Sequence, residues 1–176
     1  MPCALTQSLL DDKCLNFAGG ALEIYVTEFD NVLSITASDA SGVTAIELEE
    51  GKQFYKYAGV KNSISYTDVY TKSDAGSTSF TPTVTINLRG LRKEVRSELQ
   101  ALVRLNVIVI VKTRSKQYLL VGSGEGLEVT GFTAQSGLTG EELNGYQSLT
   151  FTGTENEMAQ FVDSSIIPAL LVPAVA

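Results

Sequence analysis

The sequence predicts a single-domain, mainly β protein with antiparallel strands and one flanking α-helix. Most of the chain consists of short runs of alternating apolar and polar residues, separated by turns rich in Gly, Ser, Asn and Asp, which is typical of strands. Only one stretch, at about 90–105, has a helical period. A chain of 176 residues with 44% apolar content can bury one sizeable core, so we expect one domain over residues 1–176.

The predicted helix leads directly into the most apolar part of the chain. Its apolar residues recur with a 3.6-residue period and form one stripe: Leu91, Val95, Leu99 and Leu102. Residues 107–111 follow, five β-branched residues without alternation, which predicts a strand buried on both faces. We expect the helix to cover one face of this strand, and a second sheet or a neighbouring subunit to cover the other.

The remaining elements are predicted from period-2 runs between turn signals. We expect strands at 21–28, around 33–35, at 43–49, 53–58, 63–70 and 80–88 before the helix, and at 117–121, 127–133 and 146–153 after the apolar strand. Residues 1–20 are predicted to form an N-terminal arm, and about 163–176 a C-terminal arm. The apolar part of this second arm, 166–176, needs a cover, and we expect a neighbouring subunit to supply it.

A long hairpin is predicted on either side of residues 71–79. These residues, TKSDAGSTS, are all small or polar and have the composition of a loop tip. Long hairpins project from the bodies that carry them. Pro82 cannot donate a ladder hydrogen bond, so it predicts an edge strand or the start of a strand.

Catalytic chemistry is not indicated. The chain has no His, no motif for a Ser or Cys nucleophile, and acidic pairs that are adjacent in sequence and so point to opposite faces of a strand. The glycine-rich stretch 122–126 would need a following helix to cradle phosphate, whereas 127–133 alternates like a strand, so we interpret it as a hairpin turn. Cys3 and Cys14 do not match a disulfide framework or a metal-ligand spacing. We predict no enzyme, and no catalytic, cofactor-binding or metal-binding residues.

The charge of the chain is unevenly distributed. The net charge is −7, which disfavours nucleic-acid binding, yet residues 89–116 contain eight basic and two acidic residues and carry +6, and the rest of the chain carries −13. A basic element on an acidic body has the complementarity to bind copies of itself head to tail. The simpler alternative is a solvated basic helix face. No apolar run reaches 18 residues, so no membrane span is predicted.

Taken together, six segments resemble tail tube and related head-to-tail ring proteins of tailed bacteriophages. They are MPCALTQSLLDDKCLNFAGG, EIYVTEFDNV, GKQFYKYAGVKNSISYTDVY, TPTVTINL, YLLVGSGEGLEVTGFTAQSG and LNGYQSLTFTGTENEMAQFV, and they extend over nearly the whole chain. The resemblance implies a β-sandwich or small barrel with one flanking helix. It also implies virion proteins, assembled in the bacterial host cytoplasm, that join their sheets into hexameric rings and stack these through loops and arms. Other phage tail or neck proteins would be partners, and genomic DNA would pass through without sequence-specific binding.

The function expected on this basis is self-assembly into the tail tube. The predicted inter-subunit residues are Arg92, Lys93 and Arg96 on the helix, and Lys72, Asp74 and Ser77 in the hairpin tip. One alternative is a neck or tail-completion ring protein of the same fold that does not polymerise. The other is a monomeric ligand-binding β-domain, whose site would be lined by Tyr55, Tyr57, Tyr66 and Tyr70. These tyrosines are equally compatible with packing on sheet surfaces.

Overall fold

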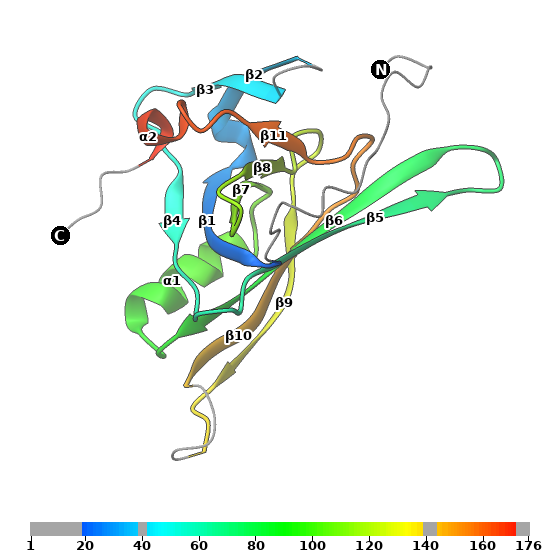
Figure 1. The fold of residues 1–176 in the computed structure, drawn as a ribbon. Helices are drawn as coiled ribbons and strands as arrows, with labels where there is room; N and C mark the ends of the chain where they lie inside the picture. Colours follow the sequence, from blue (N-terminus) through cyan, green and yellow to red (C-terminus); the bar gives the residue numbers. More distant parts are fainter. Residues whose placement is uncertain (1–18, 39–41, 139–143, 172–176) are drawn as a thin grey trace.

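The computed structural model describes residues 19–38, 42–138 and 144–171 (Figure 1). Within these residues the chain forms a seven-stranded and a four-stranded sheet, two α-helices and a short 3-10 turn at Phe29–Asn31. The mainly β, antiparallel sandwich with a flanking helix is therefore confirmed. A parallel pair, β3 with β11, is an exception to the antiparallel pattern.

The seven-stranded sheet has the order β2-β3-β11-β8-β7-β1-β4. Its strands are β1 (Ala21–Glu28), β2 (Val32–Ser38), β3 (Gly42–Leu48), β4 (Tyr55–Tyr57), β7 (Val107–Thr113), β8 (Tyr118–Val121) and β11 (Gln160–Val162). The four-stranded sheet has the order β5-β6-β10-β9 and consists of β5 (Ser65–Lys72), β6 (Thr78–Arg89), β9 (Glu128–Gln135) and β10 (Gly145–Thr152).

The main core lies between the two sheets. Inward-facing residues alternate along each strand, as the period of 2 requires, and meet in one cluster that includes Ile24 and Val26 of β1 and Leu149 and Phe151 of β10. All four are at most 2% exposed. The cluster continues under α1 (Lys93–Leu102), so the helix closes this core as predicted.

The helix is shorter than the predicted 90–105. Gly90 has a φ of +86°, a region that favours glycine, and Arg92 at the N-cap is still extended, so the helix begins only at Lys93. Leu91, assigned to the apolar stripe, is therefore outside the helix and 46% exposed. The rest of the stripe is correct, because Leu99 and Leu102 are buried and Val95 packs against the core.

Strand β7 is buried on both faces, as predicted from its lack of alternation. Val107, Val109 and Val111 face the main core, whereas Ile108 and Ile110 face a second cluster. This second cluster draws residues from β1, β3, β7, β8 and β11, so the seven-stranded sheet curls around it. The same chain thus covers both faces of β7 within the described residues.

A second helix closes the second cluster. It is α2 (Ile167–Leu170), in which Ile167 and Leu170 are 3% and 7% exposed. The N–H of Phe54, a fully buried residue, donates to the carbonyl of Leu170 at 2.8 Å and fixes this segment to the body. The expected cover by a neighbouring subunit is therefore wrong for these residues, whereas 172–176 lie outside the described part, as do residues 1–18 of the predicted N-terminal arm.

The predicted hairpin is formed by β5 and β6 and projects from the body (Figure 1). Its register is unbroken from Ser65 opposite Thr85 to Lys72 opposite Thr78. The strands extend further than predicted, so the tip is residues 73–77. Strand β6 lies between β5 and β10, and the interpretation of Pro82 as an edge or initial residue is wrong. Proline is tolerated at this position because β10 ends at Thr152, so no residue of β10 lies opposite Pro82 and needs its missing N–H. The Pro82 carbonyl still accepts a hydrogen bond from Gly153 N–H at 3.4 Å.

Candidate functional site

The tip of the hairpin is a compact turn built from two serines. Ser73 N–H donates to the Ser77 carbonyl at 2.9 Å, and the two hydroxyl oxygens lie 2.7 Å apart. Gly76 supplies the positive φ that the turn requires, +87°, and its N–H donates to the Ser73 carbonyl at 2.9 Å. The predicted residues Lys72, Asp74 and Ser77 are all exposed on this turn.

The hairpin also exposes apolar surface below its tip. Val69 and Tyr70 are each 56% exposed, and the Tyr70 ring packs on the ring of Phe80 with centroids 5.5 Å apart. A two-stranded projection has no second layer to bury such residues, so they remain available to a partner.

Within the described residues, the outer edge of β5 has no strand partner. Hydrogen-bonded and non-hydrogen-bonded pairs alternate in an antiparallel ladder. Ser73 and Ser77 are joined by a hydrogen bond, so counting back along the register makes Tyr70 and Phe80 a non-hydrogen-bonded pair. In agreement, the N–H and carbonyl of Phe80 point away from β5 and form hydrogen bonds with the backbone of Glu155. The N–H and carbonyl of Tyr70 therefore point to the free edge of the sheet.

The opposite edge of the same sheet is also open. In the described part of the chain, β9 pairs with β10 alone. Phe132 on β9 is 38% exposed and makes an edge-on contact with Tyr146, with ring centroids 5.9 Å apart. A long strand with an unpaired edge and an exposed aromatic is a pairing hazard in a protein that stays monomeric.

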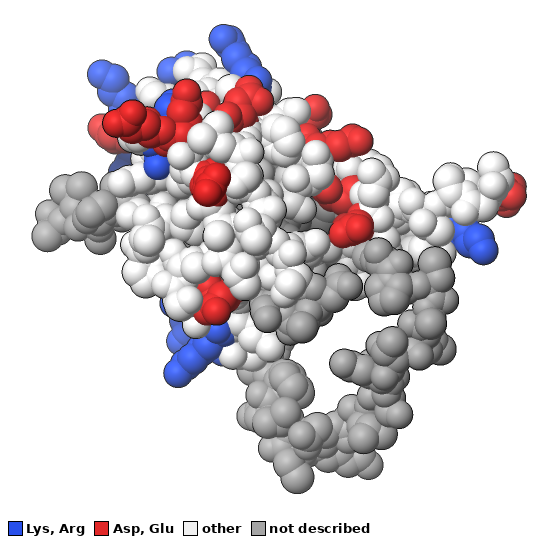
Figure 2. All heavy atoms as spheres, turned by 90° about the horizontal axis from the view of Figure 1, so that it is seen from above, with Lys and Arg blue, Asp and Glu red and all other residues white. Residues whose placement is uncertain are grey.

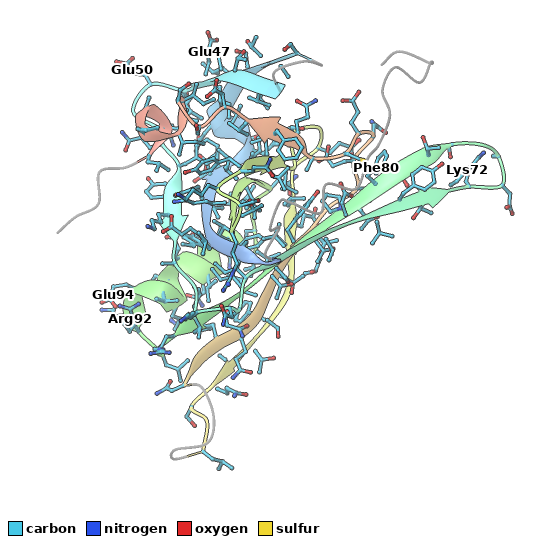
Figure 3. All side chains as sticks on the ribbon, viewed as in Figure 1. Glu47, Glu50, Lys72, Phe80, Arg92 and Glu94 are labelled. Atoms are coloured by element: carbon cyan, nitrogen blue, oxygen red, sulfur yellow. The ribbon has the colours of Figure 1, made fainter. Side chains whose placement is uncertain are left out.

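The helix α1 carries the predicted basic surface. Arg92, Lys93 and Arg96 are exposed, and none of them takes part in the ion pairs of the described residues, in which Lys56 and Lys112 approach Glu23 at 2.8 and 3.6 Å. The helix dipole disfavours cations at an N-terminus, so their position is not explained by helix stability. Figure 3 places Arg92 and the hairpin residue Lys72 on different parts of the molecule, so the two predicted triplets form two separate surfaces.

An open groove of about 430 Å³ lies beside the start of this helix. Its walls are the segment 58–61 and the end of β6, and three basic residues line it: Lys61, Arg89 and Arg92. The apolar side chains of Leu88 and Val95 also contribute to the lining. None of the residues that line this groove is acidic.

The end of the body that carries β2, β3 and α2 is predominantly acidic. Figure 2 looks onto this end and shows Asp and Glu side chains spread over it, with Lys and Arg mostly toward its margin. Glu47, Glu49 and Glu50 are exposed at the end of β3 and in the turn that follows. In Figure 3, Glu47 and Glu50 lie at one end of the body and Arg92 at the other.

The four tyrosines of the ligand-binding alternative do not converge on one site. Tyr55 and Tyr57 lie on β4 in the seven-stranded sheet, and Tyr66 and Tyr70 on β5 in the other sheet. Tyr57 and Tyr66 pack against the main core, and their hydroxyls donate to Glu98 at 2.8 Å and Asp68 at 3.1 Å. Burial, followed by the neighbouring carboxylate, raises the pKa of each of these two phenols.

A buried carboxylate at the root of the hairpin was not found from the sequence. Glu155 is 6% exposed, and its side chain accepts hydrogen bonds from Gly124 N–H at 2.9 Å and Glu125 N–H at 3.3 Å. Burial raises the pKa of Glu155, although the two backbone hydrogen bonds act in the opposite direction. The negative charge of Asp68 adds to the increase, and Asp68 itself has one buried carboxylate oxygen without a hydrogen-bond partner.

The glycine-rich stretch 122–126 is not a hairpin turn as interpreted. It leads from β8 in one sheet to β9 in the other, and these two strands do not pair. Its N–H groups do hold an anion, but that anion is the Glu155 carboxylate of the same chain. No sequence pattern links Gly124 to a residue 31 positions away, so this contact had no local signal.

Among the residues that the structure describes, no cluster of three or more His, Cys, Asp or Glu side chains is arranged to hold a metal ion. None of the described helices is long and apolar enough to cross a membrane. Cys3 and Cys14 lie outside the described residues.

Comparison of the chain with protein-family models, with curated proteins and with solved structures finds no match in any of the three. Function is therefore inferred from the open sheet edges and charged surfaces of the molecule itself.

Proposed function

We propose that this protein is a structural component of a tailed-bacteriophage virion. In this proposal it self-assembles into stacked rings that form the tail tube, a conduit through which genomic DNA passes without sequence-specific binding. The observation that carries the proposal is the four-stranded sheet β5-β6-β10-β9, in which the outer edge of β5 and the outer edge of β9 both lack a strand partner within the described residues.

The strand directions in this sheet suit repetition. Each neighbouring pair is antiparallel, so β5 and β9 run in opposite directions. When β9 of one subunit lies beside β5 of the next, the new pair is therefore also antiparallel, and a continuous sheet can form. A contact between two different edges of the same protein is heterologous, and it gives a closed ring when the rotation closes. Closure would remove both open edges.

The hairpin suits contact between rings. It projects from the body (Figure 1), Val69 and Tyr70 are exposed on it, and Lys72 next to the tip and Asp74 and Ser77 in the tip are exposed as well. The resemblance in sequence adds a hexameric ring, other tail or neck proteins as partners, and assembly in the host cytoplasm. The net charge of −7 suits a conduit, because an acidic wall repels phosphate and lets a duplex slide.

Electron microscopy of the purified protein tests this proposal directly. Negatively stained samples across a range of concentrations, with sedimentation profiles of the same samples, are expected to contain rings and tubes of uniform bore. Isolated rings that never stack would identify a neck or tail-completion ring protein instead. A protein that remains monomeric at high concentration would contradict assembly by this chain alone.

A further inference from the structure

We infer that the basic groove beside α1 receives the acidic turn after β3 of a second copy of this chain. This inference rests on the proposed assembly, and it identifies the contact that stacks one ring on the next. The groove is defined by Lys61, Arg89 and Arg92, and the acidic turn by Glu49 and Glu50 with the adjoining Glu47.

The acidic turn is held rigidly in an exposed position. Lys52 N–H donates to the Glu49 carbonyl at 3.0 Å and closes the turn, in which Gly51 has a φ of +79°. Glu49 N–H donates to the carbonyl of Asn31, a buried residue, at 2.8 Å and ties the turn to the body. A turn that is fixed before binding loses little conformational entropy when it docks.

The groove and the acidic turn carry opposite charges. The three basic residues of the groove have no ion-pair partner among the described residues, and the apolar side chains of Leu88 and Val95 also line it. The turn carries three carboxylates against the single ammonium of Lys52, and the half-buried Leu48 lies next to them. Opposite charges across an interface direct encounter and fix register.

The two features lie at opposite ends of the body, which makes the contact head to tail. The segment 51–61, which includes β4, leads from the acidic turn to the wall of the groove, and Figure 1 shows it running along the body between the two ends. Figure 3 places Glu50 and Arg92 correspondingly far apart. Each copy therefore offers a turn at one end and a groove at the other, so the contact is heterologous and can repeat along an axis.

Charge reversal at each partner tests the inference. The groove variant carries Arg89→Glu and Arg92→Glu, and the turn variant carries Glu49→Lys and Glu50→Lys. Each variant alone is expected to lose stacking in electron micrographs and sedimentation, while single rings persist. An equimolar mixture is expected to stack again, because every contact between a groove-variant ring and a turn-variant ring pairs opposite charges.

A matched control separates the groove from the general charge of the basic segment 89–116. Arg104→Glu with Lys116→Glu reverses two exposed charges of this segment, but neither residue lines the groove. This control is expected to stack like the wild type, and equal urea midpoints would show that all variants are folded.

The outcomes distinguish this inference from the proposed function. Wild-type tubes together with stacking by either single variant would overturn the inference and leave the proposed function intact. So would loss of stacking in the control, or a mixture that fails to stack. A wild-type protein that never assembles would overturn both.

Discussion

Phe80 and Glu155 exchange two backbone hydrogen bonds, each of 2.8 Å, at the root of the projecting hairpin. The side chain of Glu155 in turn accepts hydrogen bonds from Gly124 and Glu125 in the loop between the two sheets. A single residue thus fastens the hairpin to the crossover that joins the layers of the sandwich.

Removal of the Glu155 carboxylate is expected to destabilise the protein. Glu155→Ala removes the acceptor of the N–H groups of Gly124 and Glu125, both exposed residues, and a hydrogen bond of this kind contributes about 0.5–1.5 kcal/mol to the free energy of unfolding. Glu155→Gln is expected to cost less, because its amide oxygen can keep the shorter bond to Gly124. Urea denaturation of the three proteins measures the difference, and equal losses in both variants would contradict a role as acceptor.

The stabilities of the wild type and of Glu155→Gln should depend differently on pH. The pKa of Glu155 is raised above its ordinary 4.5, so the folded state binds this proton more tightly than the unfolded state. Between the unfolded-state and folded-state pKa values of this carboxyl, the free energy of unfolding therefore falls as the pH rises. Relative to Glu155→Gln, the wild type should therefore lose stability as the pH rises above 4.5 and through the raised pKa of Glu155. Urea midpoints across this range test the sign, and a wild type that gains stability relative to the variant would refute the assignment.

The position of Gly124 provides an independent test of this contact. A Cβ atom there would overlap the Glu155 carboxylate, so Gly124→Ala is expected to displace that carboxylate and lower the free energy of unfolding. Gly131→Ala on β9 is the matched control, because a Cβ at Gly131 meets no atom within 4 Å. Thermal unfolding of both variants should separate them, and similar midpoints would show that the carboxylate is easily moved.

The second core depends on Phe54, which is fully buried between the sheet and α2. Phe54→Ala is expected to cost about 3–5 kcal/mol, the range for a buried Phe that leaves a cavity. Leu33→Ala on β2 is the control, because Leu33 is 67% exposed and its loss should stay within about 0.5 kcal/mol. Equal losses in the free energy of unfolding for Phe54→Ala and Leu33→Ala would mean that packing in the second cluster adds no stability.

The free edge of β5 can be blocked without breaking the hairpin. The N–H of Tyr70 points away from β6, so Tyr70→Pro removes an outward donor and leaves the β5–β6 ladder hydrogen bonds in place. Tyr70→Thr loses the same ring but keeps that donor. If neighbouring subunits join through β5, the Pro variant should fail to form rings in electron micrographs while the Thr variant forms them. Rings in both would exclude pairing at this edge.

Local patterns predicted most of the elements but not how they are combined. The helical stripe at Leu99 and Leu102 and the double burial of β7 follow from residue periods alone, and both are confirmed. The start of the helix was misplaced because the conformations of Gly90 and Arg92 depend on how β6 ends. Pro82 was misassigned because a proline is acceptable inside β6 only where the neighbouring strand β10 has ended. That end, at Thr152, lies more than 60 residues later in the chain and leaves no local signal around Pro82.

The charged surfaces, too, were predictable from the sequence only in part. The basic character of α1 is visible in the sequence, since Arg92, Lys93 and Arg96 are close neighbours there. The groove that Arg92 shares with Lys61 and Arg89 depends on packing between three separate segments, so no sequence pattern could predict it.

The insertion of β11 between β3 and β8 has a consequence for the timing of folding. Val162 pairs with Val43 on one side and with Tyr118 on the other, so β11, the last strand among the described residues, completes a sheet whose other strands are made earlier. Until residues 160–162 leave the ribosome, β2 and β3 cannot join the remainder of that sheet. Contacts of such long sequence separation form slowly. Completion of this sheet therefore comes only after residues 160–162 have been made, late relative to the strands on either side of β11.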